Sequence, residues 1–282
     1  MEKVEKHGDK WLGTVSGDKR PRVYDGVVVS SGHHWDPRLP EYPGNFTGES
    51  LHAIEVKSRE QLQGKRVLIV GAGNTGCDLA ADAAFLSRSV DHSMRRTYYF
   101  LPKFVFGRPL DKWLDRTQRW PVPRRFLRWM YGTAIYFIVG PYERIGMPKP
   151  DHKILESFPN SASAYLDHLA HKRITPRRDI ERFEGKRVIF TDGTETEVDL
   201  VIYATGYYLT FPFMEKGLIA NDDGSSPLFM NICHREMDNL FAAGLIQPAD
   251  GGFWQLADYQ GQLIASFIVA QECAPEKADW FR

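Results

Sequence analysis

The sequence predicts an α/β protein in which one nucleotide-binding domain is inserted into another. The first observation behind this prediction is an apolar run followed by closely spaced glycines and a helical segment, within residues 65–79. The second is a repeat, because one apolar strand ends in Ser31-Gly32 before this stretch and another ends in Thr205-Gly206 after it. A glycine that directly follows a strand lets the backbone pass close beneath a cofactor. We therefore expect the outer strands to belong to one domain and the glycine-rich stretch to another.

The glycine-rich stretch has the G-x-G-x-x-G spacing of a dinucleotide-binding loop. Arg66 to Val70 is an apolar run typical of a buried parallel strand, and Cys77 to Leu86 has a helical composition. Between them, Gly71 permits a tight turn, Gly73 lets the backbone approach a pyrophosphate, and Gly76 lets the helix pack closely on the strand. A plain glycine turn is the alternative. The strand before the glycines and the helix after them favour the nucleotide site.

The residues after the next strand bear on the choice between NAD and NADP. We expect that strand at Ser89 to Ser93, and it leads into Arg95 and Arg96. Asp91 lies in the middle of the strand, whereas an NAD site places its acidic residue near the strand end. Two guanidinium groups beside a hydroxyl suit a ribose phosphate, which they would bind through charge-assisted hydrogen bonds. This pattern favours NADP, and a solvated basic turn is the alternative.

The remaining residues of the loop receive separate interpretations. Asn74 and Thr75 follow the second glycine, where the Asn74 amide either contacts the nicotinamide half of the ligand or locks the loop. Cys77 is interpreted as a small packing residue rather than a nucleophile. We expect Asp78 to cap free N–H groups in the first turn of the helix.

Composition narrows the classes of function. The 282 residues contain 36 Lys and Arg against 36 Asp and Glu, so no global field would recruit nucleic acid. Three cysteines at wide spacing argue against a disulfide framework and a zinc cluster, and His168 and His171 have no suggestively spaced partner ligand. The longest apolar run, residues 129–140, is too short to cross a bilayer. We expect a cytoplasmic protein without a transmembrane segment; a homodimer is left open.

The rest of the chain supplies strands, a crossover and a closing helix. Strands are expected at Lys10 to Val15 and at Tyr24 to Ser30, and the proline-rich residues 37–43 suggest a crossover between domains. Further along, the sequence predicts two strands paired around the Asp192-Gly193 turn, then a last strand and a closing helix: Arg187 to Phe190, Glu197 to Tyr203, Leu240 to Leu245 and Leu256 to Ala270.

Residues 102–150 lack clean periodicity and combine arginines with tryptophans. These are Arg116, Arg119, Arg124, Arg125 and Arg128, with Trp113, Trp120 and Trp129. Binding to nucleic acid or to a membrane surface is one interpretation. Because the net charge of the chain is zero, we favour a solvated, helix-covering insertion.

Several motifs together resemble the flavin-containing monooxygenase family of class B flavoprotein monooxygenases. Residues 46–52 (FTGESLH) are similar to its F-x-G-x-x-x-H fingerprint, residues 71–78 to its NADP-binding loop, and residues 199–207 (DLVIYATGY) to its linker back into the FAD domain. Shorter matches lie at 101–103, 107–109 and 150–152. The chain departs from the family at Val56, where an aromatic residue is usual, and nothing before Tyr24 resembles the family's first glycine-rich loop.

The resemblance implies a two-dinucleotide-domain flavoprotein architecture, with a Rossmann-like NADP domain inserted into an FAD domain and an N-terminal FAD-binding segment missing. The expected domains are residues 1–45 and 206–282 for the FAD domain and 46–205 for the NADP domain with a helical insertion. His52 is interpreted as a hinge or domain-interface residue, and Gln247 and its neighbours Gly244 and Gln255 resemble the segment that closes over the flavin. The expected cofactor-binding residues are Gly71, Gly73, Asn74, Thr75, Gly76, Ser93, Arg95, Arg96, Ser31, Gly32, Thr205, Gly206 and Gln247.

The activity implied by the resemblance is carried by FAD and NADPH rather than by a side chain. A flavin hydroperoxide formed with dioxygen would oxygenate a soft nucleophile, the nitrogen of an amine or the sulfur of a sulfide, as in an N,N-dimethylaniline monooxygenase. No catalytic side chain and no metal are expected. Two alternatives stay open: a Baeyer–Villiger-type monooxygenase, and an NADP-binding module without activity.

Overall fold

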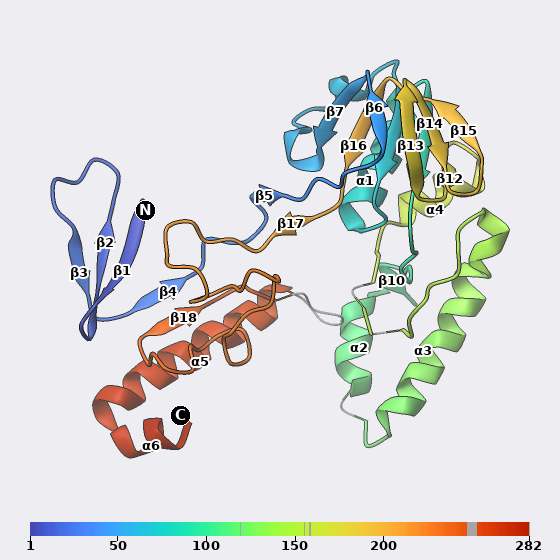
Figure 1. Ribbon diagram of the computed structural model, residues 1–282. Coiled ribbons are helices and arrows are strands. Elements are labelled where there is room, and N and C mark those ends of the chain that lie inside the picture. Colours follow the sequence, from blue (N-terminus) through green and yellow to red (C-terminus); the bar gives the residue numbers. More distant parts are fainter. Residues whose placement is uncertain (119, 155, 158, 247–252, 282) are drawn as a thin grey trace. The chain divides into compact units, whose positions relative to one another are not determined.

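The computed structural model describes residues 1–282 except 119, 155, 158, 247–252 and 282. The chain divides into two compact units (Figure 1). The central unit is Pro37–Gly206, and the discontinuous unit joins Met1–Asp36 to Tyr207–Arg282. The short strands β5 (Asp36–Pro37) and β17 (Tyr207–Tyr208) lie at the two points where the chain passes from one unit to the other. The sequence had placed these passages at 45/46 and 205/206.

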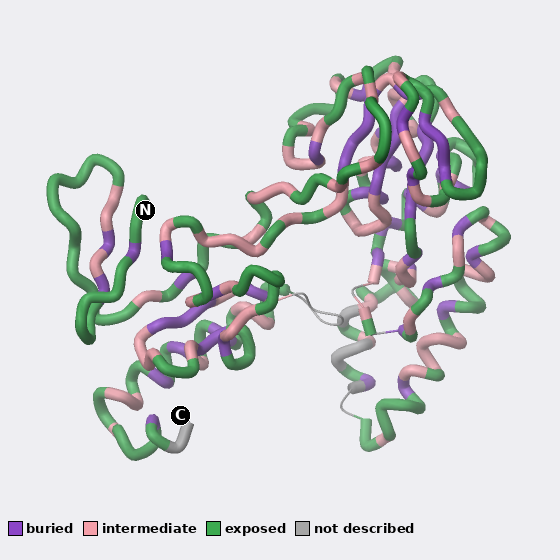
Figure 2. The backbone as a smooth tube through the Cα atoms, in the orientation of Figure 1, coloured by how far each residue is buried: buried purple, intermediate pink, exposed green. Residues whose placement is uncertain are grey.

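A five-stranded parallel sheet forms the middle of the central unit, in the order β12-β9-β8-β16-β7. Its strands are β7 (Glu49–His52), β8 (Arg66–Val70), β9 (Ser89–Ser93), β12 (Thr175–Arg177) and β16 (Leu200–Tyr203). The predicted bounds of β8 and β9 are confirmed. Strand β16 is buried along its whole length, which Figure 2 shows in purple. Burial on both faces explains why β8 and β16, in the middle of the sheet, are continuous apolar runs.

Successive side chains of the sheet enter two different cores. Val67 and Ile69 of β8 pack with helices α1 (Asn74–Leu86) and α4 (Ser163–Ala170), whereas Leu68 and Val70 pack against a second sheet. This four-stranded sheet has the order β15-β14-β13-β6, with β6 (Gly44–Phe46), β13 (Ile180–Gly185), β14 (Arg187–Phe190) and β15 (Glu195–Glu197). The central unit therefore consists of helices, a parallel sheet and a second sheet in three layers. Two short 3₁₀ helices, Ala53–Glu55 and Arg59–Leu62, precede β8.

One predicted strand pairing is wrong. Strand β14 forms its hairpin around Asp192-Gly193 with Glu195–Glu197, and residues 200–203 belong to the other sheet. The change of sheet occurs at Asp199, whose carboxylate accepts hydrogen bonds from the Arg66 backbone and side chain and from Lys186. These bonds hold the pKa of the Asp199 carboxyl well below its usual range. The ion cluster fixes the point at which the chain leaves one sheet for the other.

The insertion between β9 and α4 contains two helices, α2 (Leu110–Gln118) and α3 (Arg124–Val139). A two-residue ribbon, β10 (Phe104–Val105) with β11 (Arg108–Pro109), precedes them, and the 3₁₀ helix Tyr142–Ile145 follows. The two helices agree with the expected helical insertion, and part of its exposed surface is apolar. Aromatic side chains on α3 are exposed, including Trp129 at 65% and Phe137 at 81%.

The discontinuous unit begins with a three-stranded antiparallel sheet, β1 (Lys3–His7), β2 (Lys10–Thr14) and β3 (Arg22–Tyr24). Strand β4 (Val27–Val29) pairs in parallel with β18 (Leu240–Ala242), and helices α5 (Phe253–Cys273) and α6 (Pro275–Phe281) follow. The buried strand expected over Tyr24 to Ser30 is wrong, because it is divided into β3 and β4 and most of its residues are exposed. The division lies at Gly26, where a Cβ would press on the backbone of Asn239.

In the described residues, no helix is both long enough and apolar enough to cross a membrane.

Candidate nucleotide site

The glycine-rich loop connects β8 to α1 at the carboxyl edge of the parallel sheet. Gly71 has φ +113°, and a Cβ there would collide with the carbonyl oxygen of Ala204. A Cβ at Gly76 would collide with the carbonyl oxygen of Gly71, so the helix approaches the loop more closely than any other residue would permit. These two close approaches are the local reason for glycine at each position. The structure thus shows the strand–loop–helix unit that the spacing predicts.

The start of α1 is open to a ligand. The helix begins at Asn74, three residues before the predicted start at Cys77, and its N-cap is Gly73. Gly73 carries no side chain, and a Cβ built on it meets nothing within 4 Å. The first N–H groups of a helix have no partner within the helix and lie at its positive end. The predicted capping role of Asp78 is wrong, because Asp78 lies beyond the first turn and is exposed.

Two buried polar side chains hold the loop from the protein side, and sequence reasoning missed both. His92 of β9 is fully buried, and its Nε2 lies 2.9 Å from the Gly71 carbonyl oxygen. Asn160, also buried, donates its Nδ2 to the Ala72 carbonyl oxygen at 3.3 Å and to Cys77 Sγ at 2.9 Å. Burial raises the pKa of the Cys77 thiol to about 12, so this residue is a packing group and not a thiolate.

Asn74 locks the loop, which is one of the two roles left open for it. Its Nδ2 donates to the Pro159 carbonyl oxygen at 3.4 Å, and its Oδ1 accepts from the Ser161 N–H at 3.2 Å. The amide therefore joins the helix start to the segment that also carries Asn160. Thr75, the next residue, is exposed.

The end of β9 brings two arginines beside the loop. Because β8 and β9 are parallel neighbours, residues that follow them meet at one edge of the sheet. Arg95 and Arg96 are exposed there, and Arg96 lies over the Tyr98 ring at 5.1 Å. Ser93 is buried and donates its hydroxyl to the Arg178 carbonyl oxygen at 2.8 Å.

Asp91 does not face the nucleotide edge. Its carboxylate is buried and accepts from Arg177 Nε at 2.6 Å and from the Thr196 hydroxyl at 3.2 Å. This ion pair occupies the one acidic side chain of β9. The geometry therefore agrees with the expectation that Asp91 does not point toward a ribose.

The segment that returns from β16 is tied to His52. Gly206 has φ +84°, and its carbonyl oxygen lies 3.0 Å from His52 Nε2. The Nδ1 of the same ring accepts the Ile54 N–H at 3.3 Å, so the Nε2 carries the proton and donates to Gly206. Thr205 donates its hydroxyl to the Arg38 carbonyl oxygen. This bond joins the first residues of the central unit to its last ones, where the chain enters and leaves the unit.

The expected cofactor residues of the discontinuous unit are only partly described. Ser31 and Gly32 are exposed, and Gly32 has φ +77° with open space around it. Gly244 donates its N–H to Gln260 Oε1 at 2.8 Å, whereas Gln247 lies outside the described residues.

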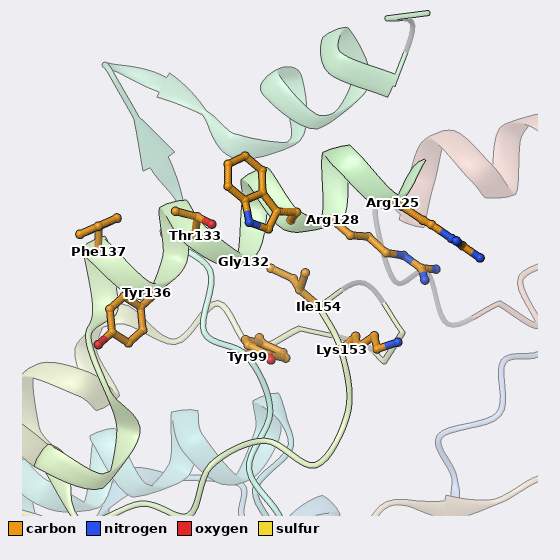
Figure 3. A pocket seen from close by; sticks show the side chains of 10 residues that line it. Tyr99, Arg125, Arg128, Gly132, Thr133, Tyr136, Phe137, Lys153 and Ile154 are labelled. Carbon is orange, nitrogen blue, oxygen red and sulfur yellow. The ribbon is translucent and has the colours of Figure 1, made fainter. Parts of the chain in front are cut away.

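A hollow lies in the central unit, along α3. This α3 groove has a volume of about 960 Å³ (Figure 3). Arg125, Arg128 and Lys153 lie toward one end, and Tyr136 and Phe137 lie toward the other. Arg128 is already paired with Glu156 at 3.3 Å.

A metal centre finds no support in the described residues, which contain no group of three His, Cys, Asp or Glu side chains suited to one. His168 is buried against Phe85, and His171 is exposed with its Nδ1 2.9 Å from the Asp167 carbonyl oxygen.

Comparison with known proteins agrees with this geometry. The family model "Flavin-binding monooxygenase-like" matches residues 6–279. The chain is 30% identical to the N-oxide-forming dimethylaniline monooxygenase 2 of Rattus norvegicus, over 83% of this chain and 45% of that protein. It is 27% identical to a 4-hydroxybenzoate brominase (decarboxylating) of Pseudoalteromonas luteoviolacea, over 96% of this chain and 55% of that one. The chain spans about half the length of the curated relatives it matches.

Among solved structures, a flavin-containing monooxygenase from Stenotrophomonas maltophilia has a TM-score of 0.66 at 19% identity, covering 97% of this chain and 70% of that chain. This likeness confirms the predicted α/β architecture of a two-dinucleotide-domain flavoprotein. The chain belongs to the flavin-binding monooxygenase-like family.

Proposed function

We propose that this member of the flavin-binding monooxygenase-like family serves NADPH- and FAD-dependent oxygenation of a soft nucleophile, an amine nitrogen or a sulfide sulfur. In this proposal the central unit binds NADP, and the discontinuous unit contributes residues to an FAD site. Dioxygen and a small nucleophilic molecule are the other reactants. Family membership and the relative that forms N-oxides support the reaction class.

The observation that carries the proposal is the carboxyl edge of β8 and β9. There the start of α1, which has no side-chain cap, follows β8, and two exposed arginines follow the neighbouring parallel strand β9. A pyrophosphate fits the first, because Gly73 leaves open space before unpaired N–H groups. A ribose 2′-phosphate fits the second, because Arg95 and Arg96 supply charge-assisted donors.

The roles of this chain's residues follow from that placement. Gly71, Gly73, Asn74, Thr75 and Gly76 shape or line the pyrophosphate site, and Arg95 and Arg96 select the phosphorylated ribose. Ser31, Gly32, Thr205, Gly206 and Gln247 remain proposed contacts to a cofactor, with no catalytic role. NADPH supplies a hydride and the flavin supplies oxygen transfer when both are bound, so the protein contributes binding and orientation.

The Arg95→Ala, Arg96→Ala double variant tests the nucleotide assignment. We expect its NADPH affinity to fall by about 2–3 kcal/mol, because two charge-assisted contacts are lost, while its NADH affinity stays nearly unchanged. Isothermal titration of both nucleotides measures the difference. Arg88→Ala is the matched control, since Arg88 is an exposed arginine just before β9, at the opposite edge of the sheet. Equal losses for NADPH and NADH would contradict the proposal.

Two further measurements separate the alternative functions. A flavin absorption band that bleaches on adding NADPH supports oxygenation, whereas a colourless chain that binds NADPH supports a nucleotide-binding module. Product analysis then distinguishes N- or S-oxides from the esters of a Baeyer–Villiger enzyme.

A further inference from the structure

Three consecutive carbonyl groups of the glycine-rich loop accept hydrogen bonds, the first two of them from buried side chains. The Gly71 carbonyl meets His92 Nε2 at 2.9 Å, and the Ala72 carbonyl meets Asn160 Nδ2 at 3.3 Å. The Gly73 carbonyl accepts the Cys77 N–H at 3.0 Å, as the first bond of α1. The first two donors are side chains from outside the loop, one on β9 and one in the segment before α4.

Fixing these carbonyls also fixes the N–H groups on the other side of each peptide. The described peptide bonds are trans, and in a trans peptide the C=O and the next N–H point in opposite directions. The N–H groups of Ala72 and Gly73 therefore point away from His92 and Asn160, and the Asn74 N–H points out of the N-terminal end of α1. Successive N–H groups directed to one side form a concave anion-binding nest.

We propose that His92 and Asn160 are positioning residues, which orient the Ala72 and Gly73 amides toward the pyrophosphate of the bound nucleotide. This inference rests on the proposed NADP site. Neither side chain needs to touch the ligand, because each acts through the carbonyl group that it holds. Sequence motifs of the loop contain neither residue.

The hydrogen-bond chain determines which nitrogen of His92 carries the proton. The Tyr165 hydroxyl lies 2.7 Å from His92 Nδ1, and the Gly71 carbonyl can only accept. Nε2 therefore donates to Gly71, and Nδ1 accepts from Tyr165. Tyr165 is itself buried and stacks on Phe100 at 5.6 Å, so the ring that holds His92 is immobilised by packing.

The central unit offers a matched control. His168 is also a buried histidine, at 2% exposure against 0% for His92, but it lies on α4 and packs edge-on against Phe85. Its Nδ1 has no hydrogen-bond partner in the described part of the chain. A substitution at His168 removes a buried imidazole without touching a carbonyl of the loop.

The test compares three ligands on the full chain: NADPH, NADH and adenosine 2′-monophosphate, which has the 2′-phosphate but no pyrophosphate. We expect His92→Leu to weaken NADPH and NADH about tenfold each, a loss near 1.4 kcal/mol, and to leave adenosine 2′-monophosphate within about twofold. His92→Gln retains a side-chain donor and is expected to recover part of the loss. His168→Leu should leave all three affinities within about twofold.

The arginine double variant should show the opposite pattern, weakening NADPH and adenosine 2′-monophosphate but not NADH. If His92→Leu weakens all three ligands equally, or if His168→Leu matches it, the positioning role is wrong. If the unsubstituted chain binds neither nucleotide, the proposed function itself fails.

Should His92→Leu not fold, Tyr165→Phe serves instead, because it keeps the stacked ring and removes the donor to Nδ1. A smaller loss of NADPH and NADH affinity, with unchanged affinity for adenosine 2′-monophosphate, supports the inference. Unchanged NADPH and NADH affinities overturn it.

Discussion

The glycine-rich loop and the α3 groove are two candidate binding regions of the same unit, built in opposite ways. The loop presents backbone amides, and buried side chains on its interior face determine their direction. The groove presents side chains, with arginines toward one end and aromatic rings such as the exposed Phe137 toward the other. A site built from backbone amides depends on buried residues that do not line it. A site built from side chains depends on the residues that line it.

The largest expected effect on stability is that of a substitution at Gly76, the helical glycine beside the loop. Gly76→Ala should lower the free energy of unfolding by about 3 kcal/mol or more, because the new methyl group collides with the Gly71 carbonyl oxygen. NADPH binding should be lost with it, because the clash displaces the loop. Urea unfolding and nucleotide titration measure both effects. A fully stable Gly76→Ala variant would show that the close approach at this helix is not required.

A second difference is the response of stability to acid. Burial lowers the pKa of His92 to about 4, whereas an unfolded chain has the ordinary value near 6.5. The unfolded state therefore binds a proton first, and stability falls as the pH drops from about 6.5 toward about 4. Between about pH 7 and about pH 5 we expect His92 to account for a loss of about 2 kcal/mol. Urea unfolding of the unsubstituted protein and of His92→Gln at both pH values measures the contribution of His92. If the free energy of unfolding falls equally in the two proteins, His92 does not contribute to the acid dependence.

The smallest expected effect has the opposite sign. Gly132 is also a helical glycine, on α3, and a Cβ there would meet only Ile154 Cγ2, at an ordinary 3.9 Å. Gly132→Ala should raise the free energy of unfolding by about 0.5–1 kcal/mol, because alanine favours a helix over glycine. The same unfolding measurement serves here. Destabilisation by Gly132→Ala would mean that the insertion is packed as tightly as the loop.

The parts of the fold that the sequence predicts best are those set by local pattern. β8 matches its predicted bounds because an apolar run that ends at Gly71 defines it locally, and β9 matches as the short segment that follows α1. The predicted strand over Tyr24 to Ser30 fails because two separate partners, β2 and β18, pair with its two halves. The prediction of one strand over residues 197–203 fails for the same reason, because the chain changes sheets at Asp199, which is bound by Arg66 from a distant part of the sequence.

The same limit explains the two residues missed at the site. His92 occupies an inward position of a buried strand, where its polarity was the only signal that it holds a carbonyl group. Asn160 meets Ala72 across a long stretch of chain that includes the whole insertion, so no spacing rule connects them. Asn74 was predicted to bind or to lock, and only its contacts near Pro159 show the second role.

The parallel pairing of β7 with β16 has a consequence for how the chain is made. Glu49–His52 forms the edge of the sheet, and its neighbour there is Leu200–Tyr203, which leaves the ribosome much later. Until then β7 has no partner in this sheet, and the flank of β8 that will receive β16 is exposed to other chains. Parallel pairing across so long a separation is slow, and unpaired apolar strands aggregate while they wait. Slow synthesis at low temperature, with chaperones in excess, is therefore the condition under which this protein should be produced.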